Sequence, residues 1–252
     1  MKNHFNRVLE YVRRTDQNYR ALYSGNHTHP IPFFGNPESA LVLTVGLNPS
    51  RDEFIESRGW PESIADSVLE TRLLKYFSPD SQPQSHPFFN PWKMALALLK
   101  PDISYSSGTV AHLDLSPRAT AFPRCHRGET PEARLWQDQF LKMLANDAHW
   151  FFEALKKCKK ARLVLMAGTA TDRFYLDQFI SKYTPSNTCL KYDQRGNSDN
   201  VSSFHNLVGL GLNLPIFFSG AGPAFQGGVR LVDNVRANLD ILNSKMCGTL
   251  SD

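Results

Sequence analysis

The sequence predicts an α/β protein in which helices cover both faces of a mainly parallel sheet. Four short apolar runs alternate with longer segments whose apolar residues recur at helical spacing. The runs are almost continuously apolar, as is typical of parallel strands buried on both faces. With 252 residues, 41% of them hydrophobic, the chain is long enough for one large core, and no linker-like stretch divides it. We therefore expect a single domain over residues 1–252.

The elements follow from the local patterns in order. Residues 4–23 are expected to form a helix, followed by a loop rich in turn-forming residues; helix and loop occupy residues 1–32, before a core from about 33 to 245. The strands are expected at 40–45, 108–115, 162–167 and 214–218. Further helices are expected near 63–77, 90–100, 131–157, 172–183 and 228–243. Residues 184–213 are polar and contain glycine, which predicts a loop around one weak strand.

Composition restricts the partners and the compartment. The formal net charge is +4, a mild excess that is compatible with a polyanionic partner without requiring one. The cysteines are isolated and form no Cys-x-x-Cys pair, which argues against a zinc or iron–sulfur site: Cys125, Cys158, Cys189 and Cys247. The charged start is unlike a secretory signal, and no apolar run approaches the ~18 residues of a membrane span. We expect a cytoplasmic monomer with reduced thiols, no metal and no membrane contact.

The segment GLNPS ends the first strand. Gly46 permits a tight turn and the close approach of another molecule, while Pro49 restricts the preceding residue to extended backbone. Asn48 either caps a turn or presents its amide at the mouth of a site. In a parallel sheet, ligands bind beyond the carboxyl ends of the strands. This rule gathers Asn48, residues 114–120, residues 168–171 and residues 219–228 at one edge.

Two other segments, one of them at this edge of the sheet, carry aromatic or charged residues. In SHPFFNPWKM, Asn90 is expected to cap a helix that begins at Pro91, and Phe88 and Phe89 either stack on a ligand ring or fold over the core. Asp114 lies within an apolar strand, where it needs an arginine partner or serves a ligand. The arginines that follow it form a local positive patch suited to phosphates: Arg118, Arg124 and Arg127.

The last two strands also lead into small-residue segments. Gly168 and Thr169 precede a helix whose first turn offers free N–H groups, with a plain N-cap as the simpler interpretation. The segment FFSGAGPAFQGG is rich in glycine but matches neither the Walker nor the dinucleotide pattern. Phe225 in this loop is either a core residue or a wedge between bases.

Together these segments resemble the uracil-DNA glycosylase superfamily. LVLTVGLNPS is similar to the first motif of its mismatch-specific and single-strand-selective branches, and HPFFNPWKMALALL to the helix start that follows in the mismatch-specific branch. RLVLMAGTATDRF resembles the strand that precedes the second motif, and PIFFSGAGPAFQGG stands where that motif lies. The resemblance covers residues from about 33 to 245.

The resemblance implies a three-layer α/β/α fold with a short, mainly parallel four-stranded sheet. It implies hydrolysis of the N-glycosidic bond of a deaminated or damaged base that is flipped out of DNA, without a cofactor. Asn48 matches the residue that orients the attacking water; an amide cannot take a proton at neutral pH, so it positions the water. Ser219 stands at the second catalytic position. The positions expected to contact the base are Gly46, Leu47, Pro49, Phe88, Phe89, Asp114, Ser116, Gly220 and Phe225. Those expected to contact DNA are Arg118, Arg124, Arg127 and Thr169.

Two departures from the family pattern leave alternatives open. The second motif has Ser219 in place of histidine or asparagine, and Asp114 replaces the asparagine that reads the base edge. A carboxylate repels a uracil carbonyl and accepts from an amino group, which suggests a base other than uracil. The chain is therefore either a DNA base glycosylase or a non-catalytic protein that binds single-stranded nucleic acid or a nucleotide on the same fold. An unrelated α/β enzyme acting on a phosphate ester is disfavoured, because no Gly-x-Ser-x-Gly or metal-ligand cluster is present in the sequence.

Overall fold

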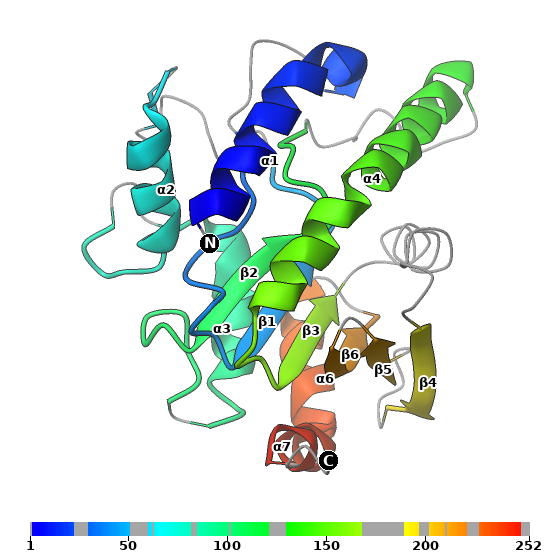
Figure 1. The fold of residues 1–252 in the computed structure, drawn as a ribbon. Coiled ribbons are helices and arrows are strands. Elements are labelled where there is room, and N and C mark those ends of the chain that lie inside the picture. Colours follow the sequence, from blue (N-terminus) through cyan, green and yellow to red (C-terminus); the bar gives the residue numbers. More distant parts are fainter. Residues whose placement is uncertain are drawn as a thin grey trace.

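A six-stranded sheet in the order β2-β1-β3-β6-β5-β4 forms the centre of the computed structural model (Figure 1). The structure describes residues 2–22, 30–50, 60–61, 63–81, 85–100, 102–120, 130–167, 189–196, 202–209, 211–220 and 227–247. β1 (Val42–Gly46) pairs in parallel with β2 (Val110–Asp114) and β3 (Leu163–Ala167), and β3 pairs in parallel with β6 (Leu212–Ser219). These are the four expected strands, so the predicted parallel arrangement is confirmed.

The rest of the sheet is antiparallel, and here the prediction was wrong. β4 (Cys189–Arg195) and β5 (Ser203–Gly209) occupy the region expected to be a loop around one weak strand. β5 pairs antiparallel with β6 and β4 antiparallel with β5, which makes the sheet six-stranded rather than four-stranded. Gly209 and Gly211 take positive φ angles of 124° and 71° at the turn between β5 and β6. Antiparallel strands tolerate polar residues on one face, so their composition resembles that of a loop.

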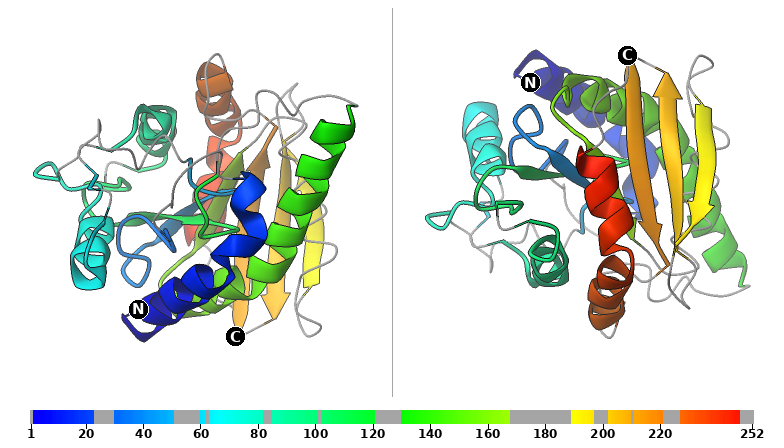
Figure 2. Two further views of the ribbon diagram at one scale, coloured as in Figure 1. Left: turned by 90° about the horizontal axis from the view of Figure 1, so that it is seen from above. Right: turned by 90° about the horizontal axis from the view of Figure 1, so that it is seen from below.

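Helices lie on both faces of the sheet (Figures 1 and 2). α1 (Lys2–Thr15), its 3-10 extension η1 (Asp16–Leu22) and the long helix α4 (Pro131–Lys157) cover one face. α3 (Asn90–Leu96), α6 (Gly227–Ala237) and α7 (Leu239–Cys247) lie on the other, and α2 (Asp66–Leu74) lies beside α1. The α/β class and the layering on two faces are confirmed; the helix expected at 172–183 lies outside the described residues.

Local sequence signals account for the start of α4, the helix that carries Asp147. α4 begins after Thr130, whose hydroxyl accepts a hydrogen bond from the N–H of Ala133, and Pro131 occupies its first turn. Its apolar residues pack into the core that also contains Phe5 and Leu9 of α1 and Leu43 of β1. Among the described helices, none has the length and apolar character needed to cross a membrane.

Candidate active site at the ends of β1 and β2

The segments that follow β1 and β2 run side by side. The N–H of Leu115 donates to the carbonyl of Gly46 and that of Ser116 to the carbonyl of Leu47, both at 3.1 Å. Further along, the N–H of Thr120 donates to the carbonyl of Pro49 at 3.2 Å. Asn48 therefore lies beside residues 114–120 at the carboxyl edge of the sheet, as its position in the sequence predicted. The carbonyls of Leu47 and Pro49 hold this loop.

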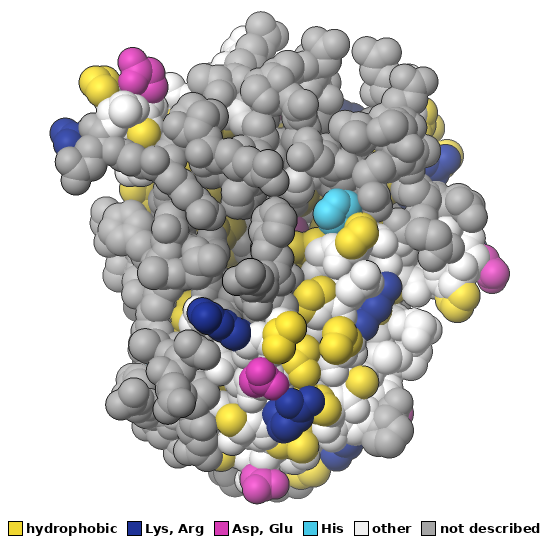
Figure 3. Space-filling view, turned by 180° about the vertical axis from the view of Figure 1, so that it is seen from behind, with side chains coloured by type: hydrophobic (Ala, Val, Ile, Leu, Met, Phe, Trp, Pro, Cys, Tyr) yellow, Lys and Arg dark blue, Asp and Glu magenta, His cyan; other side chains and the backbone are white. Residues whose placement is uncertain are grey.

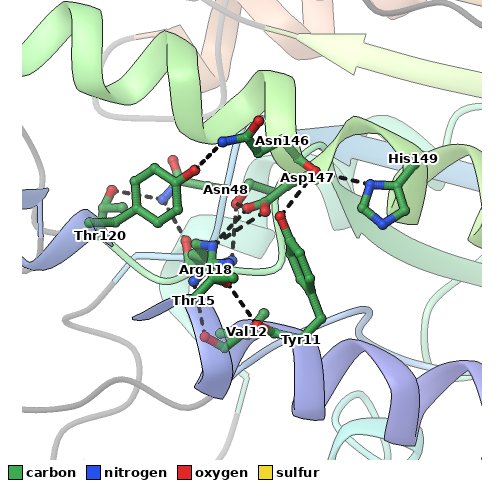
Figure 4. Close-up of polar contacts among 11 residues, drawn as sticks. Tyr11, Val12, Thr15, Asn48, Arg118, Thr120, Asn146, Asp147 and His149 are labelled. Carbon is green, nitrogen blue, oxygen red and sulfur yellow. Dashed lines mark hydrogen bonds and ion pairs between the residues drawn. The ribbon is translucent and has the colours of Figure 1, made fainter. Parts of the chain in front are cut away.

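The Asn48 side chain is anchored through its NH2 group (Figure 4). Nδ2 donates to the carbonyl oxygens of Pro49 at 2.9 Å and Arg118 at 3.1 Å, and to Oγ1 of Thr120 at 2.8 Å. Carbonyl oxygens only accept, so the orientation of the amide is determined. No described residue donates to Oδ1 of this half-buried side chain. The amide thus presents a fixed acceptor at the carboxyl edge of the sheet.

The Arg118 side chain does not reach the surface, which corrects its expected contact with phosphate. It is 1% exposed, and its Nε lies 3.0 Å from Oδ2 of Asp147 on α4. Nη1 donates to the carbonyl of Val12 at 3.3 Å and Nη2 to Oγ1 of Thr15 at 2.5 Å, both on α1 (Figure 4). The guanidinium also lies 4.8 Å from the ring centre of Tyr19. This arginine joins a loop to two helices.

Ser116 belongs to the same group and is likewise not available to a substrate. Its hydroxyl donates to Oδ2 of Asp147 at 2.6 Å and accepts from the N–H of Arg118 at 3.2 Å. Burial raises the pKa of Asp147, against the opposing influence of Arg118 and Ser116. We refer to Thr15, Ser116, Arg118 and Asp147 as the Arg118 cluster.

Sequence reasoning missed Asp147, although the sequence contains a signal for it. Phe140, Leu144, Asp147 and Phe151 follow one another at helical spacing, and all four are buried. A carboxylate on the apolar stripe of a helix needs a cationic or hydrogen-bonding partner. The signal predicts a buried ion pair, but it does not identify the partner.

Asp114 faces a different set of residues. Among the described residues its partner is a histidine, since Oδ1 lies 3.3 Å from Nε2 of His112, and Arg118 pairs with Asp147 instead. The other two arginines considered as partners lie outside the described residues. Nδ1 of His112 lies 2.8 Å from Oγ1 of Thr44, which lies 2.6 Å from the hydroxyl of Tyr105. Burial raises the pKa of Tyr105, so its phenol stays protonated. We refer to Tyr105, Thr44, His112 and Asp114 as the His112 chain.

Sequence reasoning also missed His112. It lies two residues before Asp114 in a strand, and residues at that spacing share a face of the sheet. That spacing was the available signal for a carboxylate–imidazole pair. Thr44 and Tyr105 carried no comparable signal, because their contacts cross between separate segments.

Gly46 makes room for this chain. A Cβ atom built on Gly46 would lie 2.5 Å from Oδ1 of Asp114 and 3.2 Å from Nε2 of His112. We expected the glycine to let another molecule approach the backbone. The space on its side-chain side is instead occupied by the Asp114 carboxylate, so the absence of a side chain at residue 46 permits the Asp114–His112 contact.

The two phenylalanines before α3 have different environments. Phe89 is 3% exposed and packs edge-on against His112 at 5.1 Å, so it folds into the core and does not present a ring for stacking. Phe88 is half-buried and lies against Phe89. The expected cap at Asn90 was wrong, because Nδ1 of His86 accepts from the N–H of Phe88 one turn earlier, in η4 (Pro87–Phe89).

Ser219 ends β6, which is separated from β1 by β3. The side chain is fully buried, and its hydroxyl accepts from Nδ2 of Asn234 on α6 at 2.9 Å. The hydroxyl thus joins the sheet to α6, and its expected catalytic role stays a prediction. Gly220 follows Ser219 directly. The remaining expected contacts lie outside the described residues: Thr169, Arg124, Arg127 and Phe225.

Figure 3 shows how the described basic side chains are distributed on one face of the molecule. In the described part of the face opposite the Figure 1 view, lysines and arginines are spaced apart among hydrophobic and acidic side chains (Figure 3). Among the described residues, no three His, Cys, Asp or Glu side chains are grouped as a metal site requires. No protein-family model matches the chain, and no curated protein matches it significantly. The fold and this edge define an α/β protein with a fixed amide acceptor beside two buried polar clusters.

Proposed function

We propose that this protein hydrolyses the N-glycosidic bond of a deaminated or damaged base in DNA, with Asn48 orienting the attacking water. The observation that carries this proposal is the anchored amide: Nδ2 has acceptors on both neighbouring loops, and Oδ1 receives no hydrogen bond from the described residues. An acceptor fixed in this way can hold a water molecule in one orientation without first losing side-chain entropy. The similarity of LVLTVGLNPS to the first glycosylase motif supports the same role.

In the proposed reaction Asn48 orients the water molecule and takes no proton. The C1′–N bond breaks, the base leaves with the bonding electron pair, and water adds to C1′ while its proton neutralises the base. An amide does not accept that proton, so the mechanism requires bond breaking to be advanced before water attacks. The Asp114 side chain is 3% exposed and lies against His112, so its burial does not support the expected contact between Asp114 and the base.

A second candidate is a protein that binds single-stranded nucleic acid or a nucleotide without cleaving it. Ser219 favours this candidate, because a buried serine that accepts from Asn234 stands where the glycosylase family has a histidine or asparagine. The two candidates differ in a single observable, the release of a base.

A cleavage assay on single- and double-stranded oligonucleotides separates them. The strands carry uracil, hypoxanthine or xanthine, and abasic products are revealed by alkaline cleavage on a gel. We expect Asn48→Ala to slow base release by about 10² or more while DNA affinity changes little, as for the loss of a positioning group. Asn90→Ala is the matched control, since it makes the same change at an exposed position at the start of α3.

Each outcome has a distinct meaning. Equal turnover by wild type and Asn48→Ala would restrict Asn48 to holding the turn. Binding of the oligonucleotides without release of any base would favour the non-catalytic candidate.

A further inference from the structure

We infer that the buried anchor of the Arg118 guanidinium, formed by Asp147 and Thr15, positions Asn48, because it fixes the loop whose Arg118 carbonyl and Thr120 hydroxyl hold the Asn48 amide. This inference rests on the proposed role of Asn48 for its effect on turnover. The positioning itself is a statement about one side chain and is measurable without a substrate.

Arg118 acts in two directions. Its main-chain carbonyl accepts from Nδ2 of Asn48 at 3.1 Å, on the side of the site. Its guanidinium points away from the site and into the layer formed by α1 and α4 (Figure 4). The carbonyl that holds Asn48 and the guanidinium that is anchored to the helices therefore belong to one residue.

The anchor of the guanidinium has little freedom. The side chains of Arg118 and Asp147 are both 0% exposed, and the planar guanidinium uses Nε, Nη1 and Nη2 on partners from two helices. Such a fork restricts both position and angle, which a single ammonium group cannot do. The rings of Tyr11 and Tyr19 lie 5.3 and 4.8 Å from the guanidinium carbon and complete the enclosure.

The loop between the anchor and the amide is also short and hydrogen-bonded. Ser116 connects the main chain of this loop to Asp147, since its hydroxyl accepts from the N–H of Arg118 and donates to the Asp147 carboxylate. Thr120, two residues beyond Arg118, donates its N–H to the carbonyl of Pro49 and offers its hydroxyl to Asn48. The N-terminal helix α1 is thereby coupled to Asn48 through Thr15 and Arg118.

The test weakens the anchor without changing Asn48 or the atoms that accept hydrogen bonds from its amide. Thr15→Val deletes the hydroxyl that accepts from Nη2, with almost no change in shape. Arg118→Lys keeps the charge opposite Asp147 and the main-chain carbonyl but loses the fork. Because Arg118→Lys changes a buried ion pair, Thr15→Val decides the question if the lysine variant does not fold.

Two control variants make the same chemical changes elsewhere. Thr71→Val removes a helix hydroxyl that donates to Ser67 four residues earlier, as Thr15 also donates to Tyr11. Arg13→Lys alters a forked arginine on α1 that pairs with Asp66 at the surface. Neither control touches the Arg118 cluster.

The primary readout is hydrogen exchange of the Asn48 Nδ2 protons, followed by NMR on protein labelled with ¹⁵N-asparagine and assigned by the resonance lost in Asn48→Ala. We expect exchange to become about tenfold faster in Thr15→Val and Arg118→Lys, the equivalent of one ordinary hydrogen bond. The controls should exchange as the wild type does. Unchanged exchange in folded Thr15→Val and in any folded Arg118→Lys would overturn the inference.

Turnover distinguishes this inference from the proposed function. A positioning role lowers kcat with KM for the oligonucleotide unchanged, because Arg118 is buried and does not reach DNA. Faster exchange with no base release by the wild type would leave the positioning intact and reject the glycosylase. A loss of turnover in Asn48→Ala, with exchange and turnover in Thr15→Val equal to those of the wild type, would support the glycosylase and reject the positioning by the Arg118 anchor.

Discussion

The Arg118 cluster and the His112 chain each include a residue at the carboxyl end of β2, Ser116 and Asp114, but they are built differently. The Arg118 cluster contains a buried ion pair and joins α1, α4 and the loop after β2. The His112 chain joins neighbouring strands and the segment before β2 through contacts of 2.6 to 3.3 Å. Leu113 lies with His4 and Trp150 on the side of α1 and α4, so the alternation of strand residues directs His112 to the other face.

The difference shows how each cluster supports the site. A buried ion pair between distant segments is strongly destabilising to break, since one charge is then left without its partner. The His112 chain depends on close fit, because the Asp114 carboxylate occupies the space beside Gly46. We therefore expect a variant to lose stability when the Arg118 cluster loses a charge and when the space beside the His112 chain gains an atom.

The largest effect is expected on removing the charge of Asp147. Asp147→Asn should lower the free energy of unfolding by about 3–5 kcal/mol, because the Arg118 guanidinium stays buried without its carboxylate. Urea denaturation measures it. Asp66→Asn is the matched control: it breaks an exposed Arg–Asp pair and should cost at most about 1 kcal/mol. Equal losses in the two variants would mean that the buried pair does not hold the helices.

Acid is expected to lower the stability of the folded protein through protonation of His4 of α1, which packs against α4. Burial lowers the pKa of this imidazole from 6.5 to about 4, although the nearby Glu153 opposes the shift. A histidine whose folded pKa is depressed adds stability that is complete above pH about 6.5. This stability is lost as the pH falls through about 4, because the unfolded chain binds the proton first. The full loss is about 3 kcal/mol at 1.36 kcal/mol per pKa unit.

Denaturant unfolding from pH 7.5 to 4 tests this expectation. His4→Phe keeps a ring against Trp150 and removes the titration, so its stability should change less over that interval than the wild type's. His149→Gln, at an exposed position on the same pair of helices, is the control and should follow the wild type. Parallel profiles for His4→Phe and the wild type would contradict the assignment.

A smaller effect is expected at Gly46. Gly46→Ala places a methyl group 2.5 Å from Oδ1 of Asp114, so the neighbouring groups must shift. Overpacking of this kind lowers the free energy of unfolding by about 1–3 kcal/mol. The second mutation Asp114→Ala removes the obstructing carboxylate. If the clash is the cause, the double variant loses less stability than the two single losses added together. Additive losses would place the cost of Gly46→Ala elsewhere.

Part of this molecule was predictable from its sequence. The four parallel strands were found because each is short, apolar and followed by small or turn-forming residues. β4 and β5 were missed because half-covered antiparallel strands carry polar residues. Asn48 was placed correctly beside residues 114–120, since parallel neighbouring strands end at the same edge.

The roles of the charged and hydroxyl side chains were decided by the tertiary structure. The sequence placed Asp114, Ser116 and Arg118 at the end of a buried strand. Their assignment to a base or to DNA came from this position together with the family resemblance, and Asp114 had an arginine partner as its alternative. The partners of Ser116 and Arg118 come from other elements, Asp147 from α4 and Thr15 from α1. The partner of Ser219, Asn234, comes from α6, whereas Asp114 pairs with His112 of its own strand. Local sequence determines the hydrogen bonds that an element makes with itself. A buried polar side chain takes whichever partner packing brings within about 3 Å, and that depends on residues many positions away.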